Sequence, residues 1–97
     1  MTIPVLDPRA TIEAQQALAE EATRRQRQLD DLPPTDGDLV AEAHRASVER
    51  ILGDVRAAER RLAGGVYGTC QRCQTRIPVE RLEVRPWATH CTWCAAL

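Results

Sequence analysis

Four cysteines in two close pairs are the residues of this chain with the clearest chemistry. Cys70 and Cys73 form one Cys-x-x-Cys pair, and Cys91 and Cys94 form the other, with residues 74–90 between them. A Cys-x-x-Cys turn brings two thiolates to one ion, and two such turns complete the tetrahedral four-sulfur shell that Zn²⁺ prefers. A complete shell leaves no position open for a substrate. The pattern therefore predicts one structural zinc ion with these four cysteines as its ligands.

Other uses of paired cysteines fit the sequence less well. A redox Cys-x-x-Cys requires a thioredoxin-like βαβ setting, which this sequence does not show, and the two-plus-two spacing suits zinc better than an iron–sulfur cluster. His90 directly precedes Cys91 and could substitute as a ligand, but we expect a surface histidine beside a complete four-sulfur shell. We find no pair of nucleophile and base, so the sequence does not predict an enzyme.

The composition narrows the remaining functions. The chain has 97 residues, with 13 Arg and no Lys against 14 acidic residues, and a formal net charge of −1. A free-standing DNA-binding protein normally carries a basic excess, so we do not expect direct sequence-specific DNA binding. The absence of Phe excludes a large apolar core, and zinc binding must then supply part of the folding free energy.

The start of the chain indicates its compartment. Residues 1–7 lack the basic start and long apolar run of a secretion signal, and no stretch approaches the about eighteen apolar residues of a membrane span. We therefore expect a cytoplasmic protein without membrane contact. In that reducing compartment disulfides are rare, which again favours metal binding by the cysteines.

A first helix is predicted from residue 8 to about Asp30. Asp7 offers an N-cap carboxylate, Pro8 suits the first helical position, and the following residues are strong helix formers without Gly or Pro. The apolar stripe of this helix is thin, because Arg25 occupies a position at which a continuous stripe requires an apolar residue. The stripe residues are Leu18, Ala22, Leu29 and Leu32.

A second helix is predicted from Asp36 or Asp38, either of which could cap it, to about Ala63. The prolines at 33 and 34 break the first helix, and Gly64-Gly65 ends the second. Its apolar positions alternate steps of three and four, which is the heptad pattern of a coiled coil, with His44 as a partly buried member. These positions are Ala41, His44, Val48, Ile51, Val55, Ala58 and Leu62.

The fold class follows from these elements. A short linker makes the two helices antiparallel, so we predict a mainly α protein in which a two-helix coiled-coil hairpin is followed by a small four-cysteine zinc finger. The hairpin covers residues 8–63 with its tip at about 31–38, the zinc finger covers 64–97, and residues 1–7 are expected to be a flexible N-terminus. Segments 75–79 and 81–85 could form short strands or a helical turn. Trp87 and Trp93 are expected to shield the zinc sulfurs or to pack on the base of the hairpin.

The C-terminal motifs closely resemble the DksA/TraR family of bacterial zinc-finger regulators. The resemblance rests on the aromatic-Gly pair Tyr67-Gly68 before the first cysteine pair, the stretch Arg81-Leu82-Glu83-Val84-Arg85-Pro86 and the second pair itself. It covers about 30 residues, and a preceding α-helical hairpin is also the family's architecture. The chain is nearest the short TraR-like form, with a longer hairpin.

This resemblance implies direct binding to bacterial RNA polymerase, with the coiled-coil hairpin inserted in the secondary channel to modulate initiation. Acidic residues at the tip would act near the catalytic magnesium, and Asp36 and Asp38 are the candidates here. The DksA-type tip motif, Asp-x-x-Asp-x-Ala, is not matched from either residue, so both could also be simple helix caps. The family's habit implies a monomer.

Arg81 and Arg85 are the candidate contacts to an alarmone or to the polymerase. Some family members have a Lys just after the last cysteine where this chain has Ala95, so guanosine tetraphosphate binding is not predicted. The alternative function is a zinc-stapled protein-interaction adaptor that no longer acts on the polymerase active site. A nucleic-acid-binding zinc finger is a third interpretation, which the near-neutral charge opposes.

Overall fold

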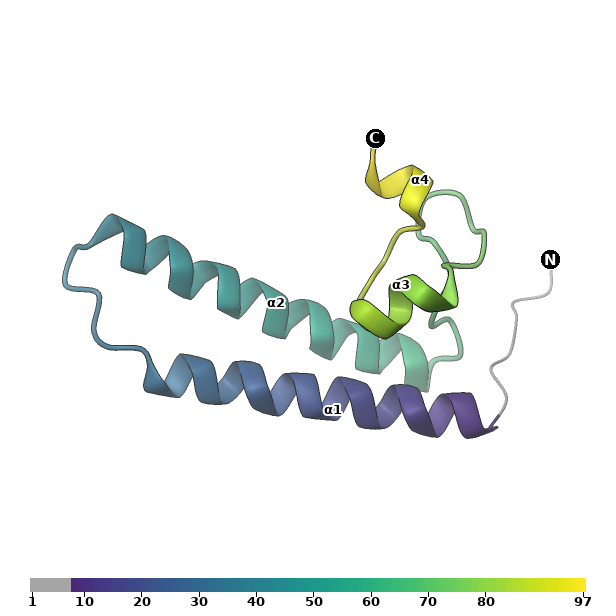
Figure 1. Cartoon of the computed structure of the whole chain (residues 1–97), viewed down its shortest axis with the longest axis horizontal. Helices are drawn as coiled ribbons and strands as arrows, with labels where there is room; N and C mark the ends of the chain where they lie inside the picture. The colour runs from purple at the N-terminus through teal and green to yellow at the C-terminus, as the bar shows by residue number, and fades with distance from the viewer. Residues whose placement is uncertain (1–7) are drawn as a thin grey trace.

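The computed structural model describes residues 8–97, which form four helices (Figure 1). Helix α1 (Pro8–Asp31) and helix α2 (Leu39–Ala63) run antiparallel, and the short helices α3 (Val79–Val84) and α4 (Thr92–Ala95) belong to the cysteine-containing part. The described residues contain no strand, only an isolated antiparallel bridge. The predicted fold class, a helical hairpin followed by a four-cysteine module, is confirmed. The proposed Asp7 cap and the flexible segment 1–7 lie outside the described residues.

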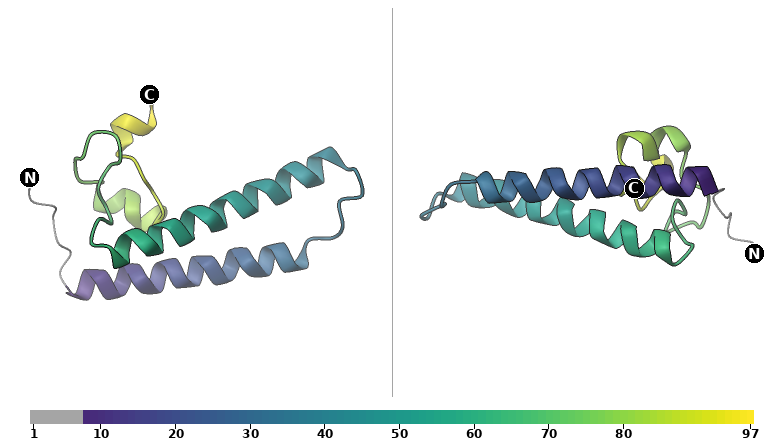
Figure 2. Two further views of the ribbon diagram at one scale, coloured as in Figure 1. Left: turned by 180° about the vertical axis from the view of Figure 1, so that it is seen from behind. Right: turned by 90° about the horizontal axis from the view of Figure 1, so that it is seen from below.

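The hairpin is a long arm with the cysteine-containing residues 64–97, the zinc module, at one end. Helices of 24 and 25 residues are each about 36–38 Å long at 1.5 Å per residue, and the molecule measures 50 × 30 × 21 Å. Figure 2 shows the zinc module against the base of the hairpin and the connecting loop at the far end. No described helix combines the length and hydropathy needed to cross a bilayer.

Helix α2 begins and ends at residues that the sequence marked. Its N-cap is Asp38, not Asp36, because the Asp38 carboxylate accepts hydrogen bonds from the backbone N–H groups of the second and third helical residues. At the other end, the N–H groups of Gly65 and Val66 donate to the carbonyls of Leu62 and Arg61. This is the Schellman arrangement, and it requires the positive φ of 77° at Gly65.

The tip loop contains a tight turn that explains the role of Asp36. Asp36 and Gly37 both have positive φ, 45° and 83°, and Asp38 N–H donates to Thr35 O at 2.7 Å. This is the pattern of a type I′ turn, for which Asp-Gly is a favoured pair. Asp36 therefore lies at the apex of the turn and is not available as a helix cap.

The main apolar cluster lies at the base of the hairpin. Its buried members are Leu18 of α1, Val55 and Ala58 of α2, and Tyr67 of the zinc module. Leu82 and Trp87 pack against the same cluster, so three segments that are distant in sequence share one core. Burial of this shared surface fixes the zinc module on the hairpin.

Two sequence-based expectations about burial were wrong. His44 is exposed, because two helices without a third layer bury only a narrow stripe and nothing covers their tip half. Trp87 packs on the base of the hairpin as expected, but Trp93 is 76% exposed on α4. The heptad positions Val48, Val55 and Ala58 are buried, and Leu52, outside the predicted pattern, is buried with them.

Candidate metal centre

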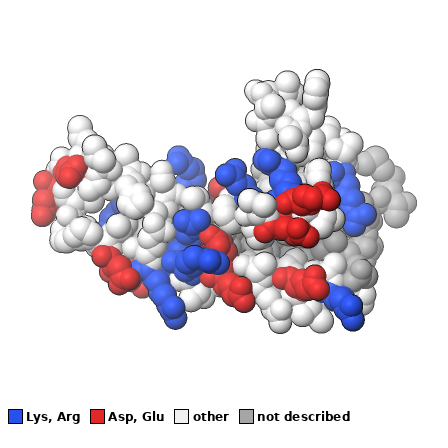
Figure 3. Space-filling model, viewed as in Figure 1, with Lys and Arg blue, Asp and Glu red and all other residues white. Residues whose placement is uncertain are grey.

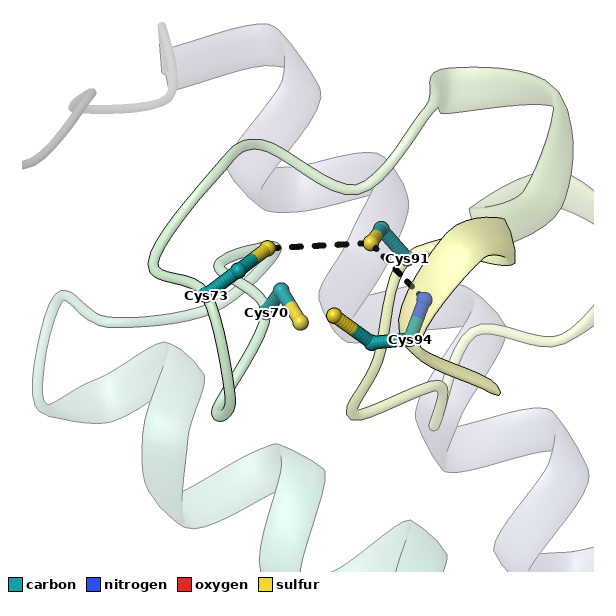
Figure 4. A group of neighbouring side chains, drawn as sticks. All are labelled: Cys70, Cys73, Cys91 and Cys94. Atoms are coloured by element: carbon teal, nitrogen blue, oxygen red, sulfur yellow. Dashed lines mark hydrogen bonds between the residues drawn. The ribbon is translucent and has the colours of Figure 1, made fainter. Parts of the chain in front are cut away.

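The structure brings the four cysteine sulfurs into one cluster (Figure 4). All four Sγ atoms lie within 4.8 Å of one another, and Cys73 Sγ is 3.7 Å from Cys91 Sγ. A tetrahedral zinc site with Zn–S bonds of about 2.3 Å has sulfur–sulfur edges of about 3.8 Å. The cluster thus has the dimensions of a C4 zinc site, and Cys70, Cys73, Cys91 and Cys94 are the residues that would hold one structural Zn²⁺.

The first pair is held by a hydrogen-bonded turn. Cys70 N–H donates to Thr75 O at 2.8 Å, and the N–H of Gln74 donates back to Cys70 O at 3.0 Å. Gln74 adopts a positive φ of 66°, which reverses the chain directly after Cys73. Thr75 Oγ1 lies 2.8 Å from Cys73 Sγ, so this hydroxyl can donate to a thiolate and orient it.

The second pair lies at the start of α4. Cys91 is the N-cap of this helix, and its Sγ accepts a hydrogen bond from Cys94 N–H at 3.4 Å. The two pairs are joined by the hydrogen bond from Gln71 N–H to Thr89 O at 2.8 Å. The backbone thus places both turns against each other independently of the side chains that bind the metal.

The site is buried on one side and open on the other. Cys70 is 0% exposed and Cys94 7%, and they pack with Ile77 and Ala88 in a small second core. Cys73 is exposed. The centre is therefore half enclosed, with ligands already positioned by packing and by the backbone.

The thiol pKa values show why this cluster favours a cation. Burial raises the pKa of Cys70. Hydrogen bonds from the backbone of Cys73, Cys91 and Arg72 lower it by more than burial raises it, so that the pKa is about 5. The pKa of Cys94 is raised to about 12 by burial and by the neighbouring thiols. Without a positive ion the four groups cannot all ionise together. A dication that accepts four thiolates removes this conflict, which fits the donor set to Zn²⁺.

The histidines do not join this ligand set. His90 Nδ1 lies 2.7 Å from Thr89 Oγ1, and the metal-binding group among the described residues contains the four cysteines alone. His44 lies on α2 toward the tip. The backbone carbonyl of His90 accepts a hydrogen bond from Arg81 Nε at 2.9 Å.

Direct contacts fix the zinc module to the hairpin. Tyr67 of the zinc module, 7% exposed, packs against the hairpin core, and its hydroxyl donates to Pro86 O of the same module at 2.7 Å. Burial lowers the pKa of the nearby Arg61, whose guanidinium donates to Trp87 O at 3.5 Å. Arg25 of α1 lies 5.9 Å from the Trp87 ring centroid. The contacts of Arg25 and Arg61 with Trp87 cross from the two long helices to the zinc module.

Sequence reasoning did not identify Arg25 and Arg61 as links. Arg25 stood out only as a defect in the apolar stripe of α1. In the structure its Nε pairs with Glu21 at 2.8 Å, and the guanidinium faces Trp87. The position of Arg25 in the apolar stripe of α1 was the sequence signal that could have identified this contact.

The other predicted site residues lie in two separate places. Asp36 and Asp38 are exposed at the tip, at the end of the molecule away from the cysteines (Figure 1). Arg81 is half-buried and donates to His90 O, whereas Arg85 is exposed and lies 5.9 Å from the Trp87 centroid. The structure therefore separates a metal centre at the base from an acidic tip.

Comparison with known proteins agrees with this geometry. Residues 65–97 match the family described as prokaryotic dksA/traR C4-type zinc finger. A stretch of 44 residues is 39% identical to an uncharacterised protein of Aquifex aeolicus (strain VF5), covering 45% of this chain and only 30% of that protein.

Two solved structures share the whole arrangement of hairpin and module. Transcription factor DksA2 from Pseudomonas aeruginosa superimposes with a TM-score of 0.78 at 22% identity, over 94% of this chain and 84% of that one. The second is described as RNA polymerase binding protein and transcriptional regulator Dks from Chlamydia trachomatis L2. It gives a TM-score of 0.69 at 18% identity, over 94% and 88% of the two chains. The likeness covers the fold from the tip of the hairpin to the zinc module.

Proposed function

Because residues 65–97 form a zinc finger of the DksA/TraR family, we propose that this chain is a transcription regulator that binds bacterial RNA polymerase directly. The observation that carries the proposal is the combination of this zinc finger with a long hairpin, since the fold of two Dks-type regulators extends over 94% of the chain. One of those two proteins is described as binding RNA polymerase.

The shape supports entry of the hairpin into the secondary channel of the polymerase. Two helices side by side are about 20 Å wide with their side chains, and the arm extends well beyond the zinc module along the 50 Å axis (Figure 1). A slender rod with an acidic end suits a narrow pore that leads to a metal-centred active site. In this proposal the zinc module positions the arm and the tip modulates initiation.

The charge distribution favours a protein partner over nucleic acid. The Arg residues of the hairpin are interspersed with acids, as in the pair Arg24–Glu21 at 3.0 Å. Figure 3 shows blue and red side chains mixed along the visible face, without a continuous basic surface. A phosphate backbone requires such a surface for affinity. We propose no catalytic step and no direct recognition of DNA sequence.

Arg81 and Arg85 differ in what they can offer a ligand. Arg81 is held by the carbonyl of His90, so its proposed role is to brace the zinc module. Arg85 is exposed beside Trp87 and is free to contact the polymerase. We do not propose an alarmone site, and the monomer remains the expected state.

A zinc-stapled adaptor for another protein is the second candidate function. It is favoured by the tip, where Asp38 is occupied as a helix cap and Asp36 is the only acid at the apex of the turn. The two functions differ in whether core polymerase retains the protein.

Binding to purified core RNA polymerase tests the proposal. Fluorescently labelled protein is titrated with the enzyme, and a known secondary-channel ligand is added as competitor. We expect binding that the competitor displaces, and an altered lifetime of open promoter complexes. Asp36→Asn/Asp38→Asn should bind but lose part of this effect, because Asn still caps α2.

Glu13→Gln/Glu83→Gln is the matched control, since it removes two exposed charges at the other end of the molecule. It should behave as wild type. Absence of binding at micromolar protein would refute the polymerase proposal and favour the adaptor.

A further inference from the structure

The tip of the hairpin exposes two neighbouring apolar side chains. Leu39 is 77% exposed and Val40 80% exposed, and they are the first residues of α2. Pro33 and Pro34 of the same loop are exposed as well. The end of the arm therefore presents an apolar surface to solvent. The start of a helix does not require apolar residues at these two positions.

The structure holds this surface in a fixed position. The Asp38 carboxylate accepts hydrogen bonds from Val40 N–H at 3.0 Å and from Ala41 N–H at 3.2 Å. Arg45, one turn further along α2, donates through Nη2 to the carbonyls of Leu32 and Pro33, both at 3.4 Å. With the type I′ turn between them, these bonds tie both sides of the loop to the helix. Little conformational freedom remains to be lost when the apolar pair contacts a partner.

Acidic side chains outnumber basic ones at the tip, where Arg45 is the one cation and donates to loop carbonyls. Asp36 stands at the apex of the turn, and residues 28–44 contain no Arg or Lys. In Figure 3 the outermost atoms of the tip, at the left, are red or white. A partner that fits this end offers an apolar patch with a cation beside it.

We propose that Leu39 and Val40 are the main docking surface of the tip, and that they seat on an apolar patch of a protein partner while Asp36 pairs with a cation at its rim. The inference rests on the proposed function, in which that partner is the polymerase. The acidic apex opposes binding to phosphate backbones or anionic membranes, and two acidic tips would repel each other. A basic and apolar protein surface is the occupant that remains.

The test compares isosteric variants of the full-length zinc-loaded protein. Leu39→Gln/Val40→Thr keeps the volumes and the helix start but removes the apolar surface. The control is Val84→Thr, which changes a valine that is 84% exposed in the zinc module. Affinity for core polymerase and the lifetime of open promoter complexes are measured for each, and circular dichroism checks the fold.

We expect the tip variant to bind roughly tenfold more weakly, since two largely exposed apolar side chains become buried on docking, and to lose its effect on promoter complexes. The Val84→Thr protein should match wild type. If the tip variant binds and acts as wild type does, the docking surface is refuted while the proposed function stands. If wild type itself does not bind polymerase, the proposed function fails and the inference fails with it.

Discussion

Leu18 is the residue on which attachment of α1 depends. It is the only buried residue of α1, is 0% exposed, and packs with Val55, Ala58 and Tyr67. Leu18→Ala removes the most deeply buried contact that α1 makes with α2 and the zinc module. We expect it to destabilise the whole protein, because no other buried side chain of α1 can compensate.

The magnitude follows from the burial of Leu18. Complete removal of a buried leucine side chain costs about 2.7–5 kcal/mol, depending on how far the cavity collapses. A chain of this length has a free energy of unfolding of about 5–15 kcal/mol, so a loss of about 3 kcal/mol is a large share. At about 4–8 °C per kcal/mol for a domain of this size, Tm should fall by about 12–24 °C.

Thermal unfolding of the zinc-loaded protein, followed by circular dichroism at 222 nm, measures this effect. Leu18→Met conserves volume and should cost less than about 1.5 kcal/mol. Ile12→Ala makes a comparable truncation on the same helix at a side chain that is 53% exposed, and it should change Tm far less. The reasoning is refuted if Leu18→Ala melts within about 4 °C of wild type, or if Ile12→Ala lowers Tm equally.

Further predictions concern the zinc module and the tip. Removal of zinc by a strong chelator, or Cys73→Ser, should unfold the zinc module and leave the hairpin partly helical; unchanged circular dichroism and Tm would contradict the structural role of zinc. Tyr67→Phe leaves the carbonyl of Pro86 without its donor and should cost about 1–3 kcal/mol in urea unfolding at neutral pH. Burial raises the pKa of Tyr67, although Arg61 opposes this, so the folded protein keeps the phenolic proton to higher pH than the unfolded chain does. The stability from this proton is full below about pH 10 and is lost as the pH rises through the raised pKa, so the difference between wild type and Tyr67→Phe should narrow in alkali. Asp38→Ala should cost about 1 kcal/mol and Asp38→Ser almost nothing, because serine also caps the helix; equal Tm values would show that the cap contributes nothing.

The features of the fold that the sequence predicted are those determined by residues close to one another in the chain. The four cysteines are spaced for one metal ion, and the structure clusters their sulfurs as that spacing requires. The ends of α2 were predictable because Asp38 and Gly64-Gly65 act within a few residues of the backbone groups that they satisfy. The sequence did not decide whether Asp36 or Asp38 caps α2, because this depends on the turn. Asp36 and Gly37 both have positive φ, and Asp38 is then the acid placed to cap the helix.

Burial was harder to predict because it depends on segments that are distant in the sequence. A heptad pattern assigned His44 to the interface, but nothing packs over the tip half of the hairpin and the ring is exposed. Trp87 lies shortly before the second cysteine pair and Trp93 lies within it, yet one packs against the hairpin and the other faces solvent. The side of the zinc module that packs against the hairpin decides which tryptophan is partly buried.

The buried residues that stabilise the fold and the proposed docking surface lie at opposite ends of the molecule. Between Leu18 of α1 and Val48 of α2, no described residue is buried, so the tip half of the arm adds little to the core that holds the molecule together. The cores and the metal centre lie at the other end. Substitution of Leu39 and Val40 should therefore leave Tm nearly unchanged while it weakens binding, and Leu18→Ala should do the reverse when it is assayed below its Tm. A tip variant that unfolds at a much lower temperature would show that the two ends are coupled through the helices, and binding losses at the tip would then need correction for the unfolded fraction.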